Sequence, residues 1–153
     1  MSSLPSVRLN KTFTHIIEHF CFGDLPRETC IELFKDGRVF SHFIEVWLEK
    51  HYPLTHVKGC KAYDFKDNND ETILYDEKTF TRNGCQFCPS SMLGAGRKFN
   101  QEEFIEKTSK LIFCFVSNVN FPEIKIKFIR GIDLLKIYPK GSIPFNNHII
   151  FFD

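Results

Sequence analysis

The sequence predicts an α/β fold in which helices flank a central mixed sheet of about five strands. Several segments carry apolar residues at helical spacing, short segments between them alternate apolar and polar residues as strands do, and one continuous apolar run is typical of a buried strand. With 153 residues, 42% of them hydrophobic and 25% charged, the chain fits one globular domain. We therefore expect a single domain over residues 1–153 with its core at roughly 37–140.

Helices are predicted from apolar spacing and from capping residues. Phe13, Ile16, Ile17 and Phe20 lie at helical spacing near the start of the chain. Asn100 is an expected N-cap, because its side chain can accept a hydrogen bond from an amide of the first helical turn. The predicted helices are 24–35, 38–50, 101–109 and 132–138.

Strands are predicted from alternation and from apolar runs. In Ile124 to Arg130 the apolar residues alternate with Lys125, Lys127 and Arg130, so these three charges should be largely exposed. They either contribute to a basic surface or protect an edge strand from aggregation. The predicted strands are 57–65, 73–81, 111–116 and 124–130, with a strand-like tail over 143–152.

Two carboxylates on successive predicted strands carry the main functional signal. If the hairpin loop is Asn69 to Glu71, Asp64 falls opposite Asp76 with the two Cβ atoms about 5 Å apart. Two like charges that close are unfavourable unless a cation lies between them, and their oxygens suit Mg²⁺. Lys78 points to the same face as Asp76 and would orient a metal-bound water, whereas Glu77 points to the other face and should matter much less.

This spacing resembles the active site of the PD-(D/E)xK nucleases, the superfamily of most type II restriction endonucleases. In that family a helix with a glutamate comes first, followed by two catalytic strands, a recognition loop, a helix and a further strand. The resemblance implies a restriction-endonuclease-like sheet, metal binding by Asp64 and Asp76, and positioning of the attacking water by Lys78. Glu45 would be the helical glutamate; otherwise it is a solvated surface acid. Two departures are that Tyr63 stands where the family often has proline and that the second acid is Asp.

The function implied by the resemblance is Mg²⁺-dependent, sequence-specific cleavage of double-stranded DNA. A chain of this size reaches one strand of a duplex, so cleavage of both strands implies a homodimer on a palindromic site. The alternatives are a homing, repair or junction-resolving nuclease of the same fold, and a non-catalytic nucleic-acid-binding module whose carboxylates are solvated hairpin residues.

The residues expected to contact DNA follow the second acid. Residues 1–77 contain 9 Lys and Arg against 13 Asp and Glu, whereas residues 78–140 contain 11 against 5. The basic half begins at Lys78 and includes the long loop 85–99, although the asymmetry could also be chance on a solvated surface. The expected DNA contacts are Thr79, Thr81, Arg82, Ser90, Ser91, Arg97 and Lys98.

The cysteines and the ends of the chain give weaker signals. Cys85 and Cys88 have a zinc-like spacing that Cys60, Cys114 or His56 could complete, but reduced free thiols are the simpler interpretation. We find no apolar run of membrane-spanning length and no signal peptide at the start, so a cytoplasmic location is expected.

Overall fold

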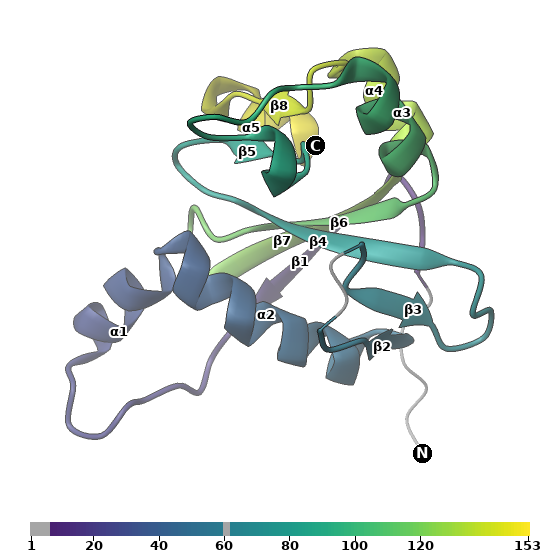
Figure 1. The fold of residues 1–153 in the computed structure, drawn as a ribbon. Helices are drawn as coiled ribbons and strands as arrows, with labels where there is room; N and C mark the ends of the chain where they lie inside the picture. The colour runs from purple at the N-terminus through teal and green to yellow at the C-terminus, as the bar shows by residue number, and fades with distance from the viewer. Residues whose placement is uncertain (1–6, 60–61) are drawn as a thin grey trace.

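The computed structural model describes residues 7–59 and 62–153 and has a mixed α/β architecture (Figure 1). Its main sheet has six strands in the order β1-β7-β6-β4-β3-β2, rather than about five. Strands β4 and β6 are parallel, and the other neighbouring pairs are antiparallel. The strands are β1 (Thr12–Ile16), β2 (Leu54–His56), β3 (Phe65–Asp67), β4 (Leu74–Phe80), β6 (Ile112–Ser117) and β7 (Glu123–Arg130).

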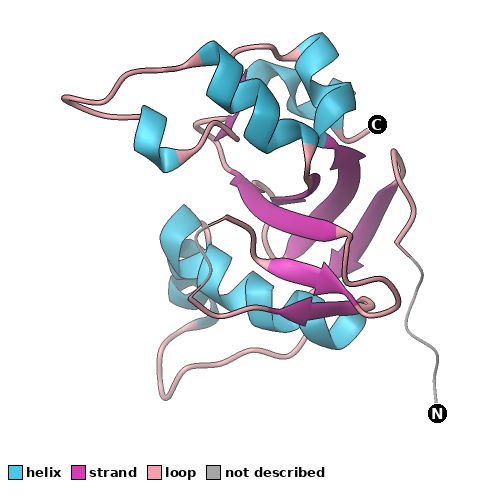
Figure 2. Ribbon diagram, turned by 45° about the vertical axis from the view of Figure 1, so that its right-hand side comes forward, coloured by secondary structure: helices cyan, strands magenta, loops and turns pink. Residues whose placement is uncertain are grey.

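Helices cover both faces of this sheet (Figure 2). Helices α1 (Arg27–Phe34) and α2 (Gly37–His51) lie on one face. The other face carries α3 (Gln101–Ser109), α4 (Gly131–Ile137), α5 (His148–Phe151), the 3-10 helices η1 (Ser90–Met92) and η2 (Phe145–Asn147), and the small sheet of β5 (Cys85–Gln86) and β8 (Ser142–Ile143). None of the helices in the described ranges is long and apolar enough to cross a membrane.

Two hydrophobic cores fix these layers to the sheet. On the α2 side, the fully buried Phe40, Ile44 and Leu48 pack among side chains of β3, β4, β6 and β7. On the opposite side, Phe80 of β4 packs with Phe113 and Phe115 of β6 and with residues of the loop after β5, α3, α4 and α5. Strand β6 is therefore buried on both faces, as its continuous apolar run predicts.

The elements with clear caps and periodicity are confirmed. Helix α2 begins where expected because the Asp36 side chain accepts hydrogen bonds from the amides of Arg38 and Val39. Asn100 caps α3 in the same way, through the amide of Glu103. Strands β4, β6 and β7 lie within one or two residues of their predicted bounds.

The helical interpretation of the first segment is wrong. Residues 12–16 form β1, which pairs antiparallel with β7 from Thr12 opposite Lys127 to Ile16 opposite Glu123. Strand β7 is thus an interior strand, so its lysines do not protect a sheet edge. Lys125 and Lys127 are half-buried, and Lys127 donates a hydrogen bond to the Phe151 carbonyl at 2.7 Å.

Two strand predictions also require correction. A turn with Gly59 at φ +77° interrupts the predicted strand 57–65, so β2 ends at His56 and β3 begins only at Phe65. The tail over 143–152 is mostly helical, because it folds back onto the second core through Phe151 and Phe152. Ile149 and Ile150 remain exposed on this tail.

Candidate active site

A pocket of about 620 Å³ lies along an open edge of β4. Strand β3 pairs with β4 only at Leu74 and Tyr75, whereas β6 pairs with β4 from Tyr75 to Phe80. Among residues 7–59 and 62–153, no strand pairs with this edge in the second half of β4, and the pocket is built there. Its lining comes from residues 36–45 at the start of α2, from Asp64, and from residues 76–83.

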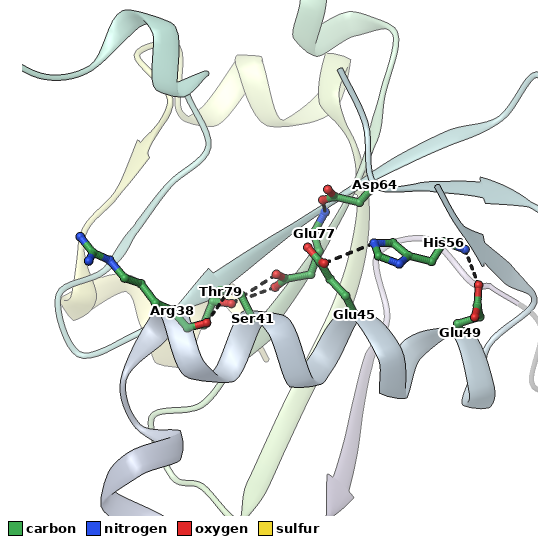
Figure 3. A network of polar contacts seen from close by, with 8 residues as sticks. All are labelled: Arg38, Ser41, Glu45, Glu49, His56, Asp64, Glu77 and Thr79. Carbon is green, nitrogen blue, oxygen red and sulfur yellow. Dashed lines mark hydrogen bonds and ion pairs between the residues drawn. The ribbon is translucent and has the colours of Figure 1, made fainter. Parts of the chain in front are cut away.

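Asp64 lies at the point where β3 leaves β4. Phe65 pairs with Tyr75, which gives the register expected for Asp64 beside Asp76, although the connecting loop is longer than three residues. The Asp64 amide donates to the Tyr75 carbonyl at 2.8 Å. Its carboxylate accepts the Glu77 amide at 2.8 Å (Figure 3). The side chain thus supplies the acceptor that β3 no longer provides at this position.

Asp76 and Lys78 form an ion pair on the face of β4 opposite α2. The Lys78 Nζ lies 3.1 Å from the Asp76 Oδ2, and the two side chains are 26% and 18% exposed. Burial raises the pKa of Asp76 to about 7; Lys78 acts against this, whereas the charge of Asp64 and a hydrogen bond with Asp64 add to it. Burial acts to lower the pKa of Lys78, but the charge of Asp76, the hydrogen bond with Asp76 and smaller contributions from Cys85 and Glu77 together raise it. The structure brings Asp64, Asp76 and Lys78 together in the lining of one pocket.

Glu77 enters the same pocket from the α2 side of the strand. Its side chain is 7% exposed, and both carboxylate oxygens accept from the Thr79 hydroxyl, at 3.0 and 3.3 Å. Burial raises the pKa of Glu77 well above its usual value, and the charges of Asp64 and Glu45 add to this. Glu77 and Asp76 lie on opposite faces of β4, as expected. Side chains from both faces of β4 line the pocket, because the strand edge between the two faces is open. Sequence reasoning missed this, since the alternation of a strand does not reveal where its neighbour ends.

Glu45 reaches the pocket from α2 and is held there by His56. The Glu45 Oε2 lies 3.3 Å from the His56 Nε2, and the Glu49 Oε2 accepts the His56 backbone amide at 2.6 Å (Figure 3). The Glu45 side chain is 24% exposed. It is therefore not the fully solvated surface acid of the alternative interpretation.

The residues expected to contact DNA divide into two groups. Thr79 and Thr81 line the pocket, together with Arg38, Ser41 and Asn83, which sequence reasoning did not select. Their position depends on how α2 docks against β4, and no local pattern encodes that docking. Four of the other five expected contacts lie outside the pocket lining, namely Arg82, Ser91, Arg97 and Lys98, and the side chain of Ser90 lies outside the described part of the structure.

The loop that carries four of these five residues is buried in the second core at its start and packs on Phe104 of α3 through Phe99 at its end. Phe87, Cys88 and Met92 are buried in the second core, whereas residues 93–100 are exposed. Gly94 and Gly96 have positive φ values of 96° and 76°, a conformation that L side chains rarely adopt. The exposed part, which contains Arg97 and Lys98, thus has a backbone conformation that depends on glycine.

The cysteines with zinc-like spacing are buried thiols. Burial raises the pKa of Cys85 and of Cys88, which favours the neutral thiols rather than the thiolates that bind zinc. Cys114, one suggested partner, is also buried, and Cys60 lies outside the described residues. No cluster of three or more His, Cys, Asp or Glu side chains in residues 7–59 and 62–153 could hold a metal ion.

A site with two carboxylates still fits Mg²⁺. This ion usually keeps several waters and takes only one or two carboxylates from the protein. Asp64 and Asp76 are close enough that the charge of one raises the pKa of the other. A cation between them would remove that repulsion, so their chemistry suits the ion.

Comparison of the chain with protein-family models, with curated proteins and with solved structures gives no match.

Proposed function

We propose that this protein is a Mg²⁺-dependent endonuclease that cleaves phosphodiester bonds of double-stranded DNA. The observation that carries this proposal is the meeting of Asp64, Asp76 and Lys78 in one pocket at an open strand edge. The order of α2 with Glu45, β3, β4, the loop, α3 and β6 agrees with the order expected for the PD-(D/E)xK nucleases. We therefore also propose that the sheet is of the restriction-endonuclease-like kind.

The proposed roles of Asp64, Asp76 and Lys78 follow from their contacts. Asp64 and Asp76 would hold the ion, which would lower the pKa of a bound water and offset charge on the scissile phosphate. The ammonium group of Lys78 has three donors, and the ion pair with Asp76 leaves others for the phosphate or the attacking water. Glu45, oriented by His56, borders the pocket beside Glu77.

The proposed partner is duplex DNA. Thr81 in the pocket and the exposed Ser91 and Lys98 on the loop supply donors for phosphates and base edges, and Arg97 adds positive charge, whereas the Thr79 hydroxyl already donates to Glu77. A homing, repair or junction-resolving nuclease would use the same site. A non-catalytic binding module with solvated carboxylates is less consistent with the structure, because Asp76 and Glu77 are largely buried.

The test is cleavage of a plasmid in the presence of Mg²⁺, followed by mapping of the ends. Asp64→Asn, Asp76→Asn and Lys78→Ala should each lower the cleavage rate at least about 100-fold, because each removes transition-state stabilisation. Glu71→Gln, an exposed acid in the same hairpin, is the matched control and should cleave like the wild type. With Ca²⁺ in place of Mg²⁺, we expect binding without cleavage. Normal cleavage by Asp76→Asn would show that the site is wrong.

A further inference from the structure

We propose that the end of the pocket at Arg38 binds a second phosphate of the strand that is cut. This inference rests on the proposed function and names a binding site for a phosphodiester group beside the catalytic one. We call the residues Arg38, Thr81 and Asn83 the donor end of the pocket.

Both walls of the pocket are acidic at one end and carry hydrogen-bond donors at the other, and the two donor ends lie on the same side. On α2, Glu45, Ser41 and Arg38 are four and then three residues apart, so they share one face of the helix. Along the chain from β4, Glu77 is followed by Thr79, Thr81 and Asn83.

Contacts between the walls show that these two sequences run side by side. The charge of Glu45 acts on Glu77 at one end. At the other end, a Cβ built on Gly37 would lie 3.2 Å from the Thr81 Cγ2. Glu45 and Arg38 are seven positions apart on α2, which places the donor end about 10 Å from Glu45 along the helix axis.

The donor groups are available for a ligand. Arg38 is exposed, and among the described residues no carboxylate forms an ion pair with it. The neighbouring acid, Asp36, turns its carboxylate onto the amides of α2. Figure 3 shows the Arg38 guanidinium extending away from α2, at the end of the network opposite His56.

The hydroxyl of Thr81 keeps its hydrogen for a ligand. Its oxygen accepts the Asn83 backbone amide at 3.1 Å, which leaves the hydroxyl hydrogen for another acceptor. Ser41 differs, because its hydroxyl donates to the Arg38 carbonyl at 3.1 Å. The donor end therefore combines a guanidinium, a hydroxyl and the side-chain amide of Asn83, a set that suits an anion with several acceptor oxygens.

A phosphate of the cut strand is the anion that the geometry favours. Each strand of a duplex carries one phosphate per 3.4 Å of helix axis, so about 10 Å corresponds to a phosphate within three of the scissile one. Binding it would fix the direction in which the strand crosses the acids. In this role Arg38 is a positioning residue, not a catalytic one.

The test uses synthetic duplexes that contain the cleavage site mapped from the plasmid. Each duplex carries one uncharged methylphosphonate, at each of the three phosphates on either side of the cut in turn. Single-turnover cleavage rates at subsaturating enzyme are compared for wild type, Arg38→Gln and Lys50→Gln. Lys50 is an exposed cation on the same helix, about 18 Å away along its axis.

At one methylphosphonate position the wild type and Lys50→Gln should lose about tenfold in rate, the effect of about 1.4 kcal/mol. Arg38→Gln should be about tenfold slower on unmodified DNA and should lose nothing further at that position. If Arg38→Gln responds to every position as the wild type does, the donor end does not bind a phosphate. If the wild type cuts no DNA under any condition, the proposed function itself fails and this inference fails with it. Equal thermal midpoints of the three proteins would show that the fold is unchanged.

Discussion

The carboxyl group of Asp76 holds its proton more tightly than an ordinary aspartate does. Burial is the main cause, and the nearby Asp64 adds to it, while the ion pair with Lys78 compensates only in part. With a pKa of about 7, Asp76 is partly protonated near neutral pH when no cation is bound. Metal binding would therefore displace a proton from this group.

A pH dependence of stability follows from this shift. The pKa of Asp76 is raised from 3.8 to about 7 in the folded protein, so the folded state binds the proton more tightly than the unfolded state. Its contribution to stability is full below about pH 4 and is lost as the pH rises through about 7. In EDTA, the thermal midpoint of the wild type should therefore fall more between pH 4 and pH 8 than that of Asp76→Asn.

The control for this experiment is Glu71→Gln, which should follow the wild type because Glu71 is an exposed acid of the same hairpin. Added Ca²⁺ should raise the midpoint of the wild type more at pH 8 than at pH 5, since protons compete for the same carboxylates. If the thermal midpoint of Asp76→Asn depends on pH as that of the wild type does, the pH dependence does not come from Asp76.

The sequence predicts some members of the site and misses others for a physical reason. Asp64, Asp76 and Lys78 are close because of a hairpin register and an alternation of two, both local properties that spacing reveals. Arg38 and Glu77 line the pocket because α2 docks beside an unpaired half of β4. Docking and strand ends depend on the whole fold, so no short pattern predicts them.

The same distinction applies to whole elements. Helices α2 and α3 are predicted well because side-chain caps and an apolar stripe fix them locally. The segment 12–16 has helical spacing but forms β1, because pairing with β7 satisfies its backbone. The tail is helical rather than extended because it covers the second core. The elements that the sequence predicts poorly are β1 and the tail, where a distant partner overrides the local apolar pattern, whereas in β4, β6 and β7 the local pattern and the distant pairing agree.

Two glycines that begin helices allow a matched test of element packing. A Cβ on Gly131 of α4 would lie 1.8 Å from the Thr108 carbonyl oxygen at the end of α3, so backbone must shift to accommodate it. A Cβ on Gly37 of α2 would meet only the Thr81 methyl group, at 3.2 Å. Gly131→Ala should lower the free energy of unfolding by about 3 kcal/mol, and Gly37→Ala should change it by less than about 1 kcal/mol.

Chemical denaturation of both variants measures this difference. Equal stability of Gly131→Ala and Gly37→Ala would mean that α3 and α4 do not approach as closely as the structure shows.

At the scale of the whole molecule, the proposed cleavage of both DNA strands calls for two copies of the site. The tail leaves Ile149 and Ile150 83% and 76% exposed, and such apolar surface favours contact with a partner. We expect a homodimer that buries this surface, with the pockets free for DNA. Sedimentation at micromolar concentration, with and without DNA, should give the dimer mass, and the double variant Ile149→Ser with Ile150→Ser should sediment as a monomer.

Lys136→Ser, an exposed change on the neighbouring α4, is the control and should remain dimeric. A strict wild-type monomer that breaks both strands in one encounter would overturn the dimer. A monomer that only nicks would favour the repair-type alternative.

The hydrogen bond from the Glu77 amide to the Asp64 carboxylate makes one backbone group depend on one side chain. In an ordinary ladder a neighbouring strand would protect this amide from exchange with solvent deuterium, but β3 has already ended here. The exchange rate of the Glu77 amide therefore reports on Asp64 directly. It also means that Asp64→Ala removes a backbone acceptor as well as a charge, whereas Asp64→Asn retains an oxygen in its place. A loss of activity in Asp64→Ala would thus combine a change in the order of the strand with the loss of the carboxylate. The exchange rate of the Glu77 amide separates these two effects.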